Sequence, residues 1–340
     1  MKQDSDKISF APCDCPAGHL ITARSYLVDR FVPDCEIIEL PAKKSGGGEL
    51  SFTRRTTTCT SPDKSRQRLA RLRRVPRLQE VKDATLIDFR SHVPQNWAHF
   101  LNNHLPIFFI LAHHTGLNPS DALLILPANT PPHILGAARV FGLDTLCTDA
   151  PVQGHAIDFT SDPWTGIRSI RADWVKLPYA QDCLDRADIR DGHQGNLPDK
   201  AFISRRGTRD LENETRVETF LTQRGYTKIY PEDLSVTDQF KLFEQAKSIV
   251  AIHGAALAPL LYRSDKSRLE KLIELFPCGH MTDVYRVMAH QVGCKWIGVR
   301  GKIKPEHIQP AYDLKEPFLK YSLQSFEIDL QSLELALDMI

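Results

Sequence analysis

Three arginines close together are the clearest chemical signal in the sequence. Arg205, Arg206 and Arg209 lie within the segment ISRRGTRD, directly after an apolar run that predicts a strand. A guanidinium group carries a permanent charge and a fork of N–H donors, which suits the oxygens of a phosphate or diphosphate. We therefore expect a phosphate site at the end of that strand. The alternative is surface ion pairing with Glu212 and Glu214.

A turn between an apolar strand and a run of small residues indicates the same chemistry. Residues 248–252 form the strand, His253 and Gly254 form the turn, and a helix is expected to begin at Ala255. Glycine lets the backbone approach a ligand closely, and the free N–H groups at a helix N-terminus attract anions. We therefore expect this turn to form one wall of the phosphate site, although such turns can also serve packing alone.

Glu274 lies inside the apolar strand LIELF, where an ionised carboxylate is costly unless it has a partner. Near the carboxyl end of a strand it could accept two hydrogen bonds from a ribose. Pairing with a buried arginine is the equal alternative.

The stretch NWAHFLNNHLPIFF carries a second polar set on an expected helix. His99 and Asn103 are four residues apart and therefore share one helix face. A histidine with a pKa near neutrality can remove the proton of a hydroxyl. We expect His99 to be this base, with Asn96 and Asn103 orienting the acceptor, whereas a packing role is the alternative for a lone helical histidine.

Metal binding is not expected. His104, His113 and His114 are spaced too irregularly for a zinc site, and no HExxH motif occurs. The eight cysteines contain no CxxC pair, and Cys13 and Cys15 have no second Cys/His pair at zinc-finger spacing. The sequence thus predicts reduced thiols, no metal and no cofactor.

Apolar runs alternate with helix-length segments, which predicts an α/β protein with parallel sheets. The expected strands are 84–89, 122–127, short strands within 144–159, 201–205, 228–230, 248–252, 269–276 and 295–299. The expected helices are 96–115, 131–141, 212–224, 236–246, one from 255, and 281–292. The expected domains are an irregular, β-containing region at 1–83, a Rossmann-like doubly wound domain at 84–180, a polar linker at 181–200, a second such domain at 201–323, and a helix at 324–340 that packs back on the body.

Composition narrows the class of protein. Among 340 residues, 43 Lys and Arg nearly balance 42 Asp and Glu, so no global field favours nucleic acid. No apolar run is long enough to cross a bilayer. The first thirty residues include Asp4, Asp6, Lys7 and Asp14 and contain no apolar signal core. We expect a soluble cytoplasmic protein. The arginines of 66–77 could contact an anionic inner membrane surface or an acidic partner, although a solvated face is the commoner outcome.

Three motifs together resemble glycosyltransferase family 61, which contains plant xylosyltransferases, animal O-linked N-acetylglucosaminyltransferases and bacterial capsule-type enzymes. The motifs are NWxHF with LP at 96–106, ISRRxxR with NE at 203–214, and HGAAL at 253–257, followed by IEL at 273–275. The resemblance covers about 84–300. The first eighty residues lie outside it.

The resemblance implies a GT-B architecture, in which two Rossmann-like domains face a cleft and the C-terminal one holds a nucleotide-sugar donor. It implies inverting transfer of a sugar to a hydroxyl of a glycan or related acceptor, as in surface polysaccharide or glycoconjugate synthesis. Arg205, Arg206, Arg209 and the turn His253 to Ala255 would hold the diphosphate, and Glu274 would meet the ribose. Asn103 stands where the family usually has an acidic residue.

Without an acidic metal site, arginines and helix N–H groups would stabilise the leaving diphosphate, so transfer is expected to be independent of metal. The Asn103 departure leaves open a non-catalytic nucleotide-sugar-binding or scaffold protein. A metal-dependent hydrolase built on the histidine cluster is a further alternative.

Overall fold

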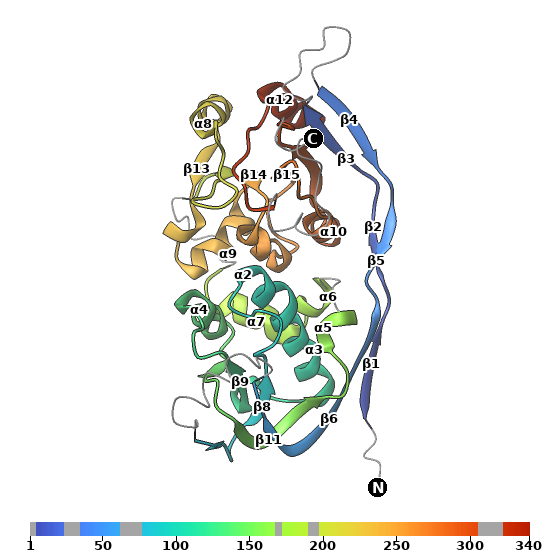
Figure 1. Ribbon diagram of the computed structural model, residues 1–340, viewed down its shortest axis with the longest axis vertical. Helices are drawn as coiled ribbons and strands as arrows, with labels where there is room; N and C mark the ends of the chain where they lie inside the picture. Colours follow the sequence, from blue (N-terminus) through green and yellow to red (C-terminus); the bar gives the residue numbers. More distant parts are fainter. Residues whose placement is uncertain (1–4, 24–34, 62–76, 167–171, 190–196, 305–321) are drawn as a thin grey trace. The chain divides into compact units, whose positions relative to one another are not determined.

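Two mixed β-sheets organise the chain (Figure 1). The computed structural model describes residues 5–23, 35–61, 77–166, 172–189, 197–304 and 322–340. The chain divides into two units. Unit 1 comprises residues 1–13 and 45–188, and unit 2 comprises 14–44 and 189–340. The protein is thus α/β, as the alternation of apolar segments predicts.

The sheet of unit 1 has the strand order β1-β6-β11-β8-β9-β10, with β7 paired to β11. β11, β8, β9 and β10 are parallel, whereas β6 is antiparallel to both β1 and β11. The bounds are β1 Asp6–Phe10, β6 Gly48–Cys59, β7 Gln79–Glu80, β8 Thr85–Asp88, β9 Ala122–Leu126, β10 Asp144–Cys147 and β11 Val152–Phe159. Leu86, Ile125, Val152 and Ala156 form a buried cluster within it.

The helical segment expected at 96–115 contains three consecutive elements. They are α2 Trp97–His99, the π-helix η1 Phe100–His104 and α3 Leu105–Thr115. Asn96 begins the segment because its side-chain oxygen accepts from the N–H groups of Ala98 and His99. Gly116, with φ of 67°, ends it. The π-turn was not predicted, and such turns are frequent at functional sites.

The other helices of unit 1 are α4 Pro132–Val140, α5 Pro163–Gly166, α6 Ala172–Val175 and α7 Pro178–Arg186, with the 3-10 turn η2 Pro119–Asp121. α4 and α7 begin with proline, which loses no hydrogen bond at a first helical position. α7 occupies the beginning of the polar segment 181–200, and its Ala180, Cys183 and Leu184 are buried.

The sheet of unit 2 has the order β13-β12-β14-β15-β16-β3-β4. Neighbouring strands are parallel except β4, which is antiparallel to β3. The bounds are β13 Thr227–Ile229, β12 Lys200–Ile203, β14 Ser248–Ile252, β15 Lys271–Phe276, β16 Lys295–Arg300, β3 Gly18–Ala23 and β4 Cys35–Leu40. β2 Cys13–Cys15 and β5 Lys43–Ser45 form a separate two-stranded sheet.

The N-terminal region supplies strands to both sheets. In Figure 1 the blue strands β3 and β4 lie beside the C-terminal elements of unit 2. Ile21 of β3 is fully buried in the same core as Val299 of β16. The sequence indicated β-structure in 1–83 but not which sheet it would join, because pairing partners depend on contacts distant in sequence.

The helices of unit 2 are α8 Glu214–Thr222, α9 Val236–Gln245, α10 Val284–Gln291 and α12 Leu330–Met339, with the 3-10 elements η3 Pro231–Asp233 and η4 Ala255–Tyr262. Ser235 and Asp329 cap α9 and α12 through their side-chain oxygens. Leu333 and Ala336 of α12 are fully buried in the core of this unit.

The segment that begins at Ala255 is a 3-10 helix and not an α-helix. Pro259 lies inside this element, where it lacks the N–H that would bond the Ala255 carbonyl in an α-helix. The basic segment 66–77 lies, except for Arg77, outside the described residues. No helix of the described residues is long and apolar enough to span a membrane.

Gly154 of β11 has no side chain, and this lets Val81 and Leu86 lie close to the backbone of β11. A Cβ at 154 would lie 2.6 Å from the Val81 carbonyl oxygen and 2.9 Å from Cδ1 of Leu86. Gly154→Ala should therefore lower the free energy of unfolding by about 1 to 3 kcal/mol in urea titrations. His155→Ala, at the adjacent exposed position, should change it by less than about 0.5 kcal/mol. Equal effects of the two variants would contradict this packing constraint.

Candidate functional site

The residues expected to bind an anion gather at one edge of the sheet in unit 2. The arginine segment follows β12, the His253–Gly254 turn follows β14, and Glu274 lies in β15. These three strands are adjacent and parallel, and Ala251 pairs with both Ile203 and Glu274. Ligands of open α/β sheets bind at the carboxyl ends of the strands. The edge is therefore a candidate ligand site.

Arg205 and Arg209 converge on one carbonyl oxygen. Nη1 of Arg205 donates to the His253 oxygen at 3.3 Å, and Nη1 of Arg209 donates to the same oxygen at 3.5 Å. Arg209 also donates from Nε to the Ser322 carbonyl, and its backbone is left-handed with φ of 61°. A non-glycine residue in this conformation is uncommon and marks a position that its surroundings hold. Two guanidinium groups thus contact the turn after β14.

Arg205 and Arg209 are two partly buried positive charges that lie close together. Burial lowers the pKa of Arg205, and burial together with the nearby charge of Arg205 lowers the pKa of Arg209. Within the part of the chain that the structure describes, neither guanidinium forms an ion pair with a carboxylate. Two half-buried like charges are unfavourable in the absence of a counter-ion. The pair is therefore suited to a phosphate-bearing ligand.

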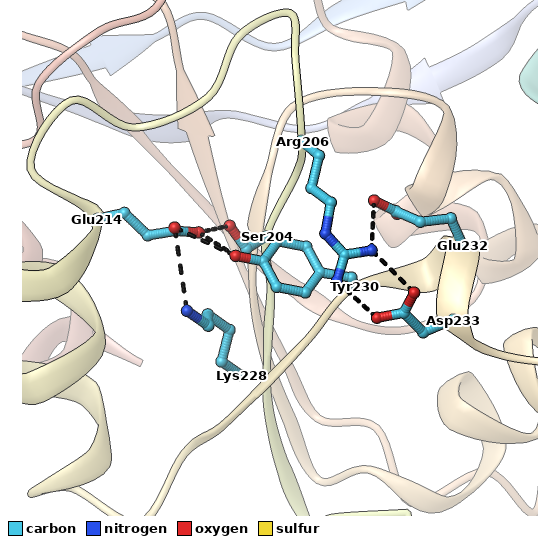
Figure 2. A network of polar contacts seen from close by, with 7 residues as sticks. All are labelled: Ser204, Arg206, Glu214, Lys228, Tyr230, Glu232 and Asp233. Carbon is cyan, nitrogen blue, oxygen red and sulfur yellow. Dashed lines mark hydrogen bonds and ion pairs between the residues drawn. The ribbon is translucent and has the colours of Figure 1, made fainter.

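Arg206 belongs to a different network (Figure 2). Its Nη1 and Nη2 donate to the two carboxylate oxygens of Asp233 at 2.8 and 2.7 Å, and Nη1 contacts Glu232 at 3.3 Å. Its guanidinium carbon lies 3.8 Å from the centre of the Tyr230 ring. The hydrogen bond to Asp233 raises the pKa of Arg206. The structure therefore brings Arg205 and Arg209 together and directs Arg206 to η3.

Glu214 is not a partner of the arginines. Figure 2 shows it beside Ser204 and Tyr230, and Tyr230 donates to its two oxygens at 3.1 and 3.2 Å. Ser204 also donates to it, and Glu212 pairs with Lys304. Glu212 and Glu214 thus have partners other than the arginines, so the ion pairing considered from the sequence is not found among the described residues.

Gly254 provides the space in which Arg205 lies. A Cβ at 254 would be 2.1 Å from Nη1 of Arg205. The Leu257 N–H donates to the Gly254 carbonyl at 3.1 Å as the first bond of η4. The N–H groups of Ala255 and Ala256 precede that bond, and such N–H groups at a helix start are donors for an anion.

Glu274 is fully buried, and both of its oxygens accept hydrogen bonds. Nδ1 of His253 donates to Oε1 at 2.5 Å, and Nε1 of Trp296 donates to Oε2 at 2.8 Å. A buried carboxylate that solvent does not reach requires hydrogen-bond donors of this kind. The two bonds fix the His253 ring, and with it the residue whose carbonyl Arg205 and Arg209 share.

Trp296 is a site residue that the sequence did not indicate. Its indole lies over Gly298, where a Cβ would be 2.9 Å from Cη2 of the indole. Gly298 pairs in register with Glu274, so the absent side chain lets the indole reach the carboxylate. The two-residue spacing of Trp296 and Gly298 on one strand face is the signal that could have revealed this.

His280 follows β15 and is a second residue that the sequence did not indicate. Its ring centre lies 5.4 Å from that of His253. Burial, followed by the neighbouring His253 and Arg209, lowers the pKa of His280 to about 4. His280 is therefore neutral at physiological pH and adds a neutral hydrogen-bonding group to this edge. The sequence signal for His280 was its place just beyond the end of an apolar strand, where ligand-binding residues of α/β sheets lie.

The polar residues of the other motif lie in unit 1. Asn96 caps α2, and the exposed His99 directs Nδ1 to the His92 carbonyl oxygen at 2.9 Å. A carbonyl only accepts, so Nδ1 carries a proton, and in the neutral ring Nε2 is then the nitrogen with the lone pair. Asn103 lies one turn further on η1 and is partly exposed. His99 thus has the tautomer that a base requires.

The turn before this helix is strained. His92 and Val93 have φ values of 58° and 55°, and neither is glycine. Nε2 of His92 lies 3.2 Å from Oδ1 of Asp162, and its ring stacks on Trp164 at 4.6 Å. These contacts hold the turn whose carbonyl orients His99. Strained backbone of this kind is commonest at functional sites.

His104 is fully buried, and both ring nitrogens face carbonyl oxygens. Nδ1 lies 2.9 Å from the His99 oxygen and Nε2 lies 3.0 Å from the Ser91 oxygen. Burial lowers the pKa of His104 to about 4 and outweighs the two carbonyls, which raise it. His113 and His114 are exposed on α3. Across the described ranges, no group of three or more His, Cys, Asp or Glu residues is arranged to hold a metal ion.

Gly254→Ala should displace the Arg205 guanidinium from the His253 carbonyl, because the added methyl group would occupy its place. Calorimetry should show nucleoside diphosphate binding weakened by about 1 to 2 kcal/mol. The melting temperature should also fall, because φ of 159° and ψ of −172° at Gly254 are values that residues with a side chain rarely adopt, so binding is compared at a temperature where the variant is folded. Arg206→Ala serves as the control and should affect binding less, because its guanidinium is held by Asp233. Stronger loss in Arg206→Ala would contradict this arrangement.

The lowered pKa of His104 predicts pH-dependent stability. The unfolded chain takes up the proton near pH 6.5, whereas the folded chain does so only near 4. The stabilisation is therefore complete above pH 6.5 and is lost as the pH falls towards 4, by up to about 3 kcal/mol. Urea unfolding at several pH values should show a smaller loss in His104→Gln. Parallel curves for the two proteins would refute this origin.

Comparison with known proteins gives one family. The sequence model of the family described as Glycosyltransferase 61 matches residues 97–269, more than half of the 340 residues. No curated protein matches the chain. The matched segment includes His99, the arginine segment and the His253–Gly254 turn, whereas Glu274 and Trp296 lie beyond it. The chain therefore belongs to glycosyltransferase family 61.

Proposed function

We propose that this protein transfers a sugar, with inversion, from a nucleotide-diphosphate sugar to a hydroxyl of a glycan or related acceptor. The convergence of Arg205 and Arg209 on the His253 carbonyl carries the proposal, because it places two guanidinium groups, neither ion-paired among the described residues, at a strand edge suited to a diphosphate. Membership of the family supports glycosyl transfer. The GT-B division of labour implied by the resemblance would assign the donor to unit 2 and the acceptor to unit 1.

On the donor side, the diphosphate is the leaving group and gains negative charge as its bond to the sugar breaks. Arg205, Arg209 and the first N–H groups of η4 would stabilise that charge. Arg206 would support the loop through Asp233. Glu274 already accepts from His253 and Trp296, which favours a role in positioning the turn over direct contact with a ribose.

On the acceptor side, we assign the general base to Nε2 of His99. The acceptor hydroxyl oxygen forms the bond to the anomeric carbon, the bond from that carbon to the diphosphate oxygen breaks, and the hydroxyl proton passes to Nε2. The nucleoside diphosphate leaves with the electron pair. Asn96 holds the start of the helix, and Asn103 would orient the acceptor from the same helical segment.

The positive charge of the two arginines supports transfer without a metal ion. Two alternatives are a binding protein without turnover and a metal-dependent hydrolase. Full activity in excess chelator would exclude the hydrolase, and turnover of any nucleotide sugar would exclude the binding protein.

The test begins with a thermal-shift screen of nucleotide sugars, with and without chelator. A donor that binds the folded chain should raise the melting temperature by several degrees in both conditions. With that donor, His99→Ala should keep the thermal shift and lose about 10²- to 10⁴-fold in kcat. His113→Ala, an exposed histidine on α3, is the matched control and should behave as the parent. Absence of stabilisation by every nucleotide sugar would contradict the proposal.

A further inference from the structure

A pocket of about 460 Å³ opens in unit 1 where three parallel strands end. Arg90 follows β8, Asn129 follows β9 and Asp149 follows β10, and all three residues line it. The strands are adjacent in the sheet, so their carboxyl ends meet at one edge. The volume lies within the range of about 300 to 1,000 Å³ that small-molecule sites occupy.

The lining combines amide groups with small apolar surfaces. Nε2 of Gln95 donates to Oδ1 of Asn129 at 3.1 Å, and both residues line the pocket together with Ser61. Val93 and two prolines supply the apolar part. Amides and hydroxyls both donate and accept hydrogen bonds, as sugar hydroxyls do, while the C–H face of a sugar ring suits an apolar wall.

The charges of the lining argue against an anionic ligand. Arg90 is neutralised within the wall, because its Nε and Nη2 donate to the two oxygens of Asp88 at 2.9 and 2.6 Å. Its Nη1 donates to the Ala150 carbonyl at 2.8 Å. Asp149 adds a carboxylate to the lining. A neutral, hydroxyl-rich ligand therefore fits these residues better than a phosphate.

Val93 contributes an independent observation. It has φ of 55°, although β-branched residues strongly disfavour this conformation, and 58% of its surface is exposed. An exposed side chain gains little from packing, so burial does not explain the strain. Its neighbour His92 provides the carbonyl that orients His99. One strained turn therefore contributes to the pocket and to the assigned base.

We propose that this pocket binds the ring of a neutral sugar, through the amides of Gln95 and Asn129 and the apolar face of Val93. The binding of a sugar ring does not depend on the proposed function, and only the assignment of that ring to the acceptor or the donor rests on it. The ring could belong to the acceptor, which we favour because the same turn holds His99, or to the sugar moiety of the donor.

Saturation-transfer NMR of the full chain with methyl glycosides of common hexoses and pentoses tests the proposal. At least one glycoside should bind without nucleotide, and inorganic phosphate should not compete with it. Gln95→Ala and Asn129→Ala should each weaken binding about five- to tenfold. Asn118→Ala is the matched control, because it removes a similar exposed amide contact, to Asp121, before β9.

Val93→Gly separates function from packing. Glycine relieves the strain at positive φ, so this variant should raise the melting temperature and still weaken glycoside binding. A lower melting temperature with unchanged binding would identify Val93 as a packing residue and overturn its role.

Competition with a nucleotide sugar distinguishes the two sources of the ring. Displacement of the glycoside by nucleotide sugar, but not by nucleoside diphosphate, would assign the pocket to the donor sugar, and simultaneous binding would assign it to the acceptor. Binding of no glycoside, equal binding in all amide variants, or displacement by phosphate would overturn the proposal. Glycoside binding without transfer from any nucleotide sugar would preserve the pocket and reject only the proposed function.

Discussion

The buried carboxylate of Glu274 is the constraint on which the candidate site of unit 2 depends. It lies in a central strand with no exposed surface, and burying a carboxylate without partners is costly. Its partners are His253 and Trp296, which approach from the neighbouring strands β14 and β16. Three adjacent strands are thereby joined by side chains near their carboxyl ends. The hydrogen bond between His253 and Glu274 fixes the position of the turn after β14.

The position of that turn determines where charge accumulates. The His253 carbonyl accepts from Arg205 and Arg209, and Gly254 leaves the space that Arg205 fills. Burying two like charges side by side is unfavourable, so this turn is the part of unit 2 best suited to an anion. Arg206, one residue from Arg205, has acidic partners and no such role. Adjacent arginines therefore serve different purposes because their surroundings differ.

In unit 1 the organising feature is backbone strain. The left-handed pair His92 and Val93 turns the His92 carbonyl towards His99 and places Val93 at the edge of a pocket. The contact of His92 with Asp162 and its stacking on Trp164 stabilise this turn. The following π-helix brings His104 back to the His99 carbonyl. The carbonyl that orients His99 and part of a polar pocket wall thus arise from one short segment.

The sequence alone predicted the α/β class and most elements from residue 84 onward, because apolar periodicity and caps such as Ser235 act locally. It also indicated the arginine segment, the His253–Gly254 turn and the helix of His99, since these motifs are contiguous. It did not reveal the sheet that β3 joins, the Trp296 contact with Glu274, or the division between Arg205 and Arg206. Those features depend on which strands become neighbours and on the space beside each side chain. Only the tertiary structure decides them, because partners distant in sequence meet solely when the sheets have formed.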